Sequence, residues 1–173
     1  IQSEHARRNI DMKPYQVFAR MKPERAERIL DAIHKQTPGV YTQAVAAAAA
    51  TMKARPQFMM KQPRDRRAKL VRQALSRVAA SPIAEEVLAN YFLEIRKDLL
   101  TEWLDAVSLE HEDGVLKGEA PPPPEDADLE KALDAYRQPE SDDADDRELL
   151  LEAFAAQTSV DWPLLEQRIG IES

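Results

Sequence analysis

The sequence predicts an all-α protein: a helical bundle with a long central helix, followed by a Pro-rich linker and an acidic helical segment. Three observations carry this prediction. Apolar residues recur at spacings of three and four along most of the chain, the period of one helix face. Most prolines fall where a first helical turn tolerates them. No stretch alternates apolar and β-branched residues over five or more positions, so no strand is predicted.

The first part of the chain reads as short helices separated by proline. We expect helices over residues 14–20, 23–36 and 40–54, with a break at residues 37–39, where proline and glycine follow a threonine. The third helix contains five consecutive alanines, the residue with the highest helix propensity. Small side chains let neighbours approach closely, so we expect this helix at the centre of the bundle.

A connector then leads to a basic helix over residues 63–80. The connector carries the apolar run Phe58-Met59-Met60, which is either core filling or an exposed docking spot. On a helical wheel, residues 63–80 place aliphatic side chains on one arc and cations on the other. Arg67 falls inside the apolar arc, where we expect its long stem to carry the guanidinium outward to solvent.

The strongest helical pattern runs from Pro82 to about His111. It predicts either one long helix or two helices with a bend near Leu100-Thr101. Its apolar stripe should be buried and includes Leu88, Phe92, Ile95, Leu99 and Trp103. The domain boundaries that follow are a bundle over residues 14–112, a linker over 113–127 with four consecutive prolines, and an acidic segment over 128–173. Short helices are predicted in that segment over residues 128–138, 146–157 and 160–169.

Charge divides the chain sharply. Residues 1–80 hold 17 Lys and Arg against 6 Asp and Glu, a balance of +11. Residues 81–173 hold 7 Lys and Arg against 25 Asp and Glu, a balance of −18. Such asymmetry indicates a polyanionic partner, a partner protein, or one half that folds against the other, although two differently solvated surfaces would also produce it.

Composition and motifs argue against several kinds of chemistry. The chain has no cysteine, which excludes disulfides, zinc–thiolate sites and cysteine nucleophiles and favours an intracellular, cytoplasmic protein. No apolar run approaches the roughly 18 residues that span a bilayer, so no membrane partner is expected. His5, His34 and His111 are the only histidines, and we expect ordinary surface roles for all three.

Two groups of side chains are possible metal ligands. Asp31 and His34 share a helix face. A row of carboxylates lies opposite the apolar stripe of the long helix: Glu94, Asp98, Glu102 and Asp105. Helical di-metal sites, however, use inward-facing Glu-x-x-His pairs, and none occurs in this sequence. We therefore expect no catalytic residue, no metal and no cofactor, and an enzyme is the less favoured interpretation.

The basic helix is the most suggestive element for binding. Its candidate contacts to a polyanion or a partner are Arg64, Arg66, Lys69, Arg72 and Arg77. The favoured function is a non-catalytic helical interaction or regulatory module that binds a partner protein or a second copy of itself in a homodimer. The alternative is a nucleic-acid-associated protein that uses residues 63–80, masked by the acidic segment. We further expect the acidic segment to dock on the basic half, because its short helices cannot bury their apolar residues alone.

Overall fold

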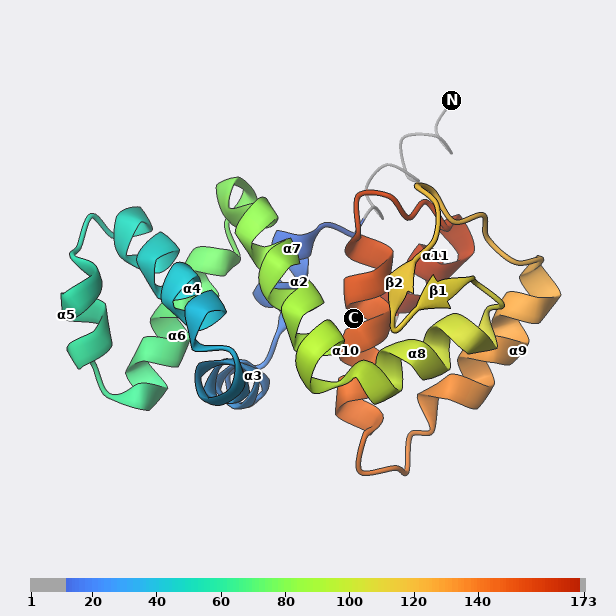
Figure 1. Ribbon diagram of the computed structural model, residues 1–173, viewed down its shortest axis with the longest axis horizontal. Helices are drawn as coiled ribbons and strands as arrows, with labels where there is room; N and C mark the ends of the chain where they lie inside the picture. The colour runs from blue at the N-terminus through green and yellow to red at the C-terminus, as the bar shows by residue number, and fades with distance from the viewer. Residues whose placement is uncertain (1–11, 172–173) are drawn as a thin grey trace. The chain divides into compact units, whose positions relative to one another are not determined.

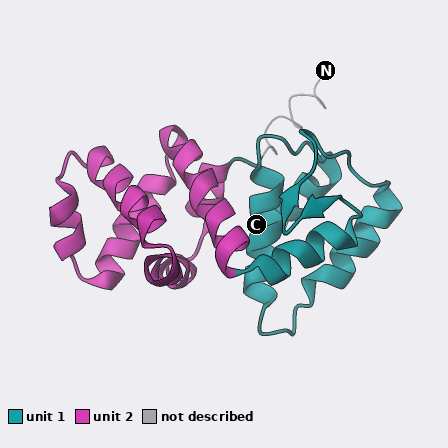
Figure 2. Cartoon of the chain, in the orientation of Figure 1, with its two compact units in different colours: residues 1–13, 96–173 teal, residues 14–95 magenta. Residues whose placement is uncertain are grey.

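The fold is predominantly helical, as the sequence predicts. A computed structural model describes residues 12–171, in which helices are joined by short connections and accompanied by one small β-hairpin (Figure 1). The chain divides into two compact units (Figure 2). Unit 2 spans Pro14–Ile95, and unit 1 consists of Ile1–Lys13 and Arg96–Ser173. This division falls at Arg96, whereas the sequence placed it in the linker over 113–127, because the helix that follows Arg96 packs with the acidic segment.

Unit 2 is built from short helices. Their bounds are α2 Pro14–Arg20, α3 Pro23–Gln36, α4 Pro38–Thr51, α5 Pro56–Lys61, α6 Arg64–Leu75, η1 Val78–Ala80, α7 Ser81–Asn90 and the π-helix η2 Tyr91–Ile95. Proline occupies the first turn of α3, α4, α5 and α7, where its missing N–H has no helical partner. Helices α3, α4 and α6 pack against one another, and the alanine-rich α4 buries Ala48 and Ala49 between its neighbours.

The single long central helix is not confirmed, and the alternative of two helices with a bend is closer to the structure. The segment consists of α7, one turn of π-helix and a separate helix, α8, spanning Lys97–Ala106. The break is at Arg96, whose backbone leaves the helical region with φ −119° and ψ 47°, and not near Leu100-Thr101. The apolar stripe was better predicted. Leu88, Phe92, Leu99 and Trp103 are buried, and only Ile95 remains half-buried.

Unit 1 contains α8, the hairpin strands β1 His111–Glu112 and β2 Val115–Leu116, and the helices α9 Asp126–Arg137, α10 Ala144–Ala156 and α11 Pro163–Ile171. The prediction that no strand would form is wrong. Strands β1 and β2 pair antiparallel, and the turn between them places Asp113 at φ 51° and Gly114 at φ 91°. Positive φ at both central residues is what a tight two-residue hairpin turn requires, and the dipeptide Asp-Gly favours it.

Aromatic side chains form the core of unit 1. Trp103 of α8 makes edge contacts with Tyr136 and Phe154, with ring centroids 5.2 and 5.9 Å apart. The ring centroids of Phe154 and Trp162 lie 5.0 Å apart, and the Trp162 Nε1–H donates to the Pro121 carbonyl at 2.9 Å. The run of prolines is therefore fixed to this core. Seven large apolar residues of the acidic segment are buried: Leu129, Leu133, Tyr136, Leu149, Phe154, Trp162 and Leu165. Since α8 already packs on α9 and α10 inside unit 1, their burial does not require the basic half.

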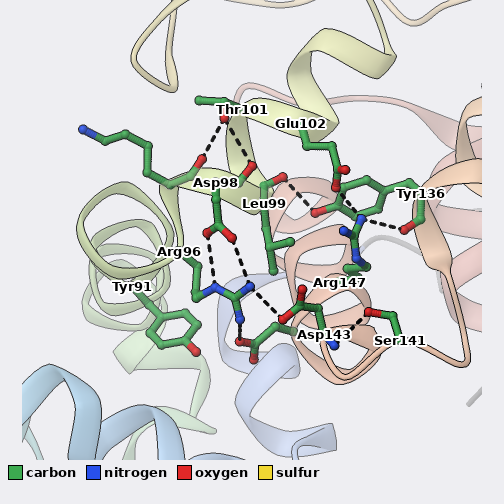
Figure 3. Close-up of polar contacts among 12 residues, drawn as sticks. Tyr91, Arg96, Asp98, Leu99, Thr101, Glu102, Tyr136, Ser141, Asp143 and Arg147 are labelled. Carbon is green, nitrogen blue, oxygen red and sulfur yellow. Dashed lines mark hydrogen bonds and ion pairs between the residues drawn. The ribbon is translucent and has the colours of Figure 1, made fainter.

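Two arginines tie the helices of unit 1 together (Figure 3). Arg96, at the break before α8, contacts Asp146 at 2.6 Å, Asp143 at 3.0 Å and Asp98 at 3.2 Å. Asp143 and Asp146 lie at the start of α10, so this guanidinium joins the N-terminal ends of α8 and α10.

Arg147 is the second of these arginines. It donates to the Tyr136 carbonyl at 3.0 Å, pairs with Glu102, and lies 4.9 Å from the centre of the Tyr136 ring. The Tyr136 hydroxyl in turn donates to the Leu99 carbonyl at 2.9 Å. The network therefore joins α8, α9 and α10.

Replacing Arg96 with methionine should lower the free energy of unfolding of unit 1 by about 3 kcal/mol at neutral pH. The reason is that Asp146, whose side chain is only 4% exposed, would lose its guanidinium partner. The chain has two tryptophans, Trp103 and Trp162, and both lie in unit 1, so their fluorescence during urea unfolding follows this unit. The control is Arg168→Met. Its ion pair with Glu130 is exposed and should contribute less than about 1 kcal/mol.

The loss in free energy of unfolding caused by Arg96→Met should be smaller at acidic pH. The hydrogen bond from Arg96, reinforced by its charge, holds the pKa of Asp98 below its usual range. A carboxylate with a lowered pKa in the folded state adds stability that is present at neutral pH and is lost as the pH falls through that pKa. The gap between wild type and Arg96→Met should therefore narrow below about pH 4. A gap that stays constant down to acid unfolding would contradict this role for the carboxylates.

Candidate protein-docking surface

The cations predicted from the basic helix do not form one face. Arg64 pairs with Asp31 and Glu27 of α3, at 3.2 and 3.8 Å. Arg72 turns toward α2 and donates to the Phe18 carbonyl at 3.3 Å. Arg64 nevertheless stays 59% exposed, and Arg66, Lys69 and Arg77 are exposed as well. Four of the five predicted contacts therefore reach solvent, although Arg64 and Arg72 also have partners within unit 2.

Arg67 turns inward, contrary to the prediction that it would reach solvent. The residue is 9% exposed, and its Nη1 donates to the carbonyls of Met60 and Gln62 at 2.8 and 3.1 Å. Its Nε donates to the Tyr41 hydroxyl, and the guanidinium lies 5.8 Å from the centre of the Tyr41 ring. The two carbonyls belong to the C-terminal end of α5, which has no helical donor for them. The buried guanidinium supplies that donor and holds α5 in place.

Helix α5 lies at one end of unit 2, beside α4 (Figure 1). Met59 points into the core and is fully buried, at 0% exposure. Its neighbours on either side face outward, Phe58 with 51% and Met60 with 42% of their surface exposed. Met52, after the end of α4, is also exposed. Within the Phe58-Met59-Met60 run, one residue therefore fills the core and two remain at the surface.

Positive charge lies beside Phe58. Phe58 lines a shallow hollow together with Ala54, Arg55, Gln57 and Lys61. Arg55, Lys61 and nearby Lys53 are exposed, and no Asp or Glu occurs anywhere between residues 32 and 64. We refer to the exposed side chains of Lys53, Arg55, Phe58, Met60 and Lys61 as the α5 surface. It combines apolar contact area with cations on a helix that is anchored from the inside.

The candidate metal ligands are occupied by other partners. Asp31 contacts Lys35 at 3.1 Å and Arg64, and these two cations, the Lys35 hydrogen bond first, hold its pKa below the usual range. His34 stacks on Tyr41 with ring centroids 4.1 Å apart. No group of three His, Cys, Asp or Glu side chains in the described part of the chain is placed to hold a metal ion.

Three of the four carboxylates in the row predicted on the long helix are likewise engaged in unit 1. Asp98 contacts Arg96, Glu102 contacts Arg147, and Asp105 contacts His111 Nε2 at 2.7 Å. Glu94 is an exposed residue of η2, and His5 lies outside the described residues. Across residues 12–171, no helix has the length and apolar character needed to cross a bilayer.

Comparison of the chain with protein-family models, with curated proteins and with solved structures found no match. The chemistry of the side chains described above is therefore the basis for the functional argument.

Arg67→Met should lower the free energy of unfolding of unit 2 by about 2–3 kcal/mol, because charge-assisted hydrogen bonds to two carbonyls and a hydroxyl are lost. Urea unfolding of the full chain followed by far-ultraviolet circular dichroism measures this change. Tryptophan fluorescence of unit 1 should remain as in wild type. The matched control is Arg66→Met, the same substitution one residue earlier at an exposed position, which should change stability by less than about 0.5 kcal/mol. Equal effects of the two variants would show that Arg67 does not anchor α5.

Proposed function

We propose that this chain is a non-catalytic helical protein-interaction module, and that the α5 surface docks an acidic, apolar segment of a partner protein. The observation that carries the proposal is that Phe58 and Met60 stay exposed on a helix fixed by Met59 and Arg67. Large apolar side chains that are held outward in a fixed place mark interaction sites more often than scattered surface residues do. The absence of cysteine agrees with a partner met in a reducing compartment such as the cytoplasm.

The residue types of this surface favour a protein partner. Aromatic side chains supply much of the energy of protein interfaces, and methionine adapts to differently shaped apolar partners. Arg55 and Lys61 border the hollow beside Phe58 and favour a partner segment that carries Asp or Glu. Apolar burial would supply the affinity, while the complementary charge would mainly raise the rate of association and set the orientation.

Nucleic acid is the second candidate, and the exposure of Arg66, Lys69 and Arg77 favours it. Phosphate neutralisation would make binding fall steeply with salt. The triple variant R66E/K69E/R77E should then abolish oligonucleotide binding at low salt, whereas Phe58→Ser should leave it unchanged. A filter-binding titration with duplex and single-stranded probes decides this point. Failure of both probes to bind at low salt excludes the candidate.

The docking proposal is tested with a designed peptide probe. A fluorescent amphipathic helix with leucine on one face and glutamate on the other should bind the full chain, and the same helix with lysine in place of glutamate should not. Phe58→Ser should weaken binding about tenfold or more, because it removes the central apolar contact. Val78→Ser is the matched control, since Val78 is a 70% exposed apolar residue elsewhere in unit 2.

Fluorescence anisotropy titrations measure all six combinations of the three proteins and the two peptides. Equal affinity for the acidic and basic peptides would contradict the proposal. A Phe58→Ser variant that binds the acidic peptide as tightly as wild type would contradict it as well. An effect of Val78→Ser as large as that of Phe58→Ser would move the docking site away from α5.

A further inference from the structure

Unit 1 carries a surface that is apolar like the α5 surface but has the opposite charge. We call residues 110–126 the acidic proline segment. It contains six Asp and Glu residues and one lysine, together with the four consecutive prolines. Apolar side chains are exposed among these carboxylates: Val115 is 59% exposed, and Pro122 and Pro123 also face solvent. The segment is therefore both negatively charged and apolar at its surface.

The acidic proline segment is held in shape along its length. Strands β1 and β2 pair at its start, and the Lys117 N–H donates to the Glu110 carbonyl at 3.1 Å beyond them. The Trp162 indole fixes Pro121 at 2.9 Å, and α9 begins at Asp126. Consecutive prolines also restrict their own backbone. A segment with so little freedom left to lose binds with a low entropic cost.

We infer that the occupant of the α5 surface is the acidic proline segment of a second copy of this chain. Cations at Arg55 and Lys61 would face the carboxylates of the segment. Phe58 and Met60 would contact the exposed prolines, since proline-rich segments dock on aromatic side chains. This inference rests on the proposed docking function and names its partner.

A second copy fits the charge division of the sequence. Residues 1–80 carry a balance of +11 and residues 81–173 a balance of −18, so the basic part of one copy and the acidic part of another attract each other. The two contacting surfaces differ, so each copy offers one of each. Such a head-to-tail contact gives a ring or an extending chain of copies. An association of this kind is weak, concentration-dependent and sensitive to salt.

The test is sedimentation velocity of the full chain over a wide range of concentrations in low and high salt. Wild type should associate in low salt, and high salt should reverse this. Phe58→Ser and the double variant P122S/P123S should each weaken self-association about tenfold or more. Val78→Ser, the same kind of exposed change outside both surfaces, should associate like wild type.

Mixing the two defective variants makes the test specific. Phe58→Ser retains an intact acidic proline segment, and P122S/P123S retains an intact α5 surface, so a mixture should form a dimer with one copy of each and grow no further. A wild-type chain that stays monomeric at every concentration overturns the inference. Association of P122S/P123S as strong as that of wild type overturns it as well, and so do variants that fail to complement each other.

The acidic peptide probe separates this inference from the proposed function. A monomeric wild-type chain that still binds the peptide through Phe58 retains the docking function, and the partner is then a different protein. Loss of both peptide binding and self-association removes the docking function together with the inference.

Discussion

The burial of the Arg67 guanidinium is the interaction on which the candidate docking surface depends. A helix as short as α5, with six residues, cannot hold its own backbone in place. Two of the carbonyls at its end obtain their donors from Arg67, and Met59 secures it to the core. Because these two contacts come from the inner side, the outer side can carry Phe58 and Met60 without collapsing onto unit 2. The exposed apolar area follows from how the helix is anchored.

Arginine side chains also join structural elements in unit 1. Arg96 contacts carboxylates at the starts of α8 and α10, and Arg147 contacts a carboxylate of α8 and a carbonyl of α9, so much of the charge in this part of the sequence is engaged inside the unit (Figure 3). In unit 2, Arg64 pairs at the surface with carboxylates of α3, and Arg72 donates to a carbonyl of α2. The stretch around α5 differs from these regions, because no Asp or Glu lies between residues 32 and 64 to pair with its cations.

The sequence predicts where the helices lie along the chain better than it predicts which way individual side chains point. Proline in first turns and apolar spacing locate most helices, because both act within a few residues. The direction of Arg67 depends on carbonyls supplied by α5, which a helical wheel does not contain. The break at Arg96 depends on Asp143 and Asp146, almost fifty residues later. Asp113-Gly114, by contrast, is a local hairpin signal that the sequence does carry, although its flanking residues lack the usual alternation.

Methionine oxidation tests the central claim, that α5 is fixed with one methionine inward and the next outward. Dilute full-length protein is treated briefly with hydrogen peroxide, and oxidation at each methionine is followed by mass spectrometry. Oxidation follows exposure, so Met60 should react much faster than its neighbour Met59, which is 0% exposed and serves as the internal control. Similar rates at the two positions would show that α5 turns or frays in solution, and would contradict the docking surface.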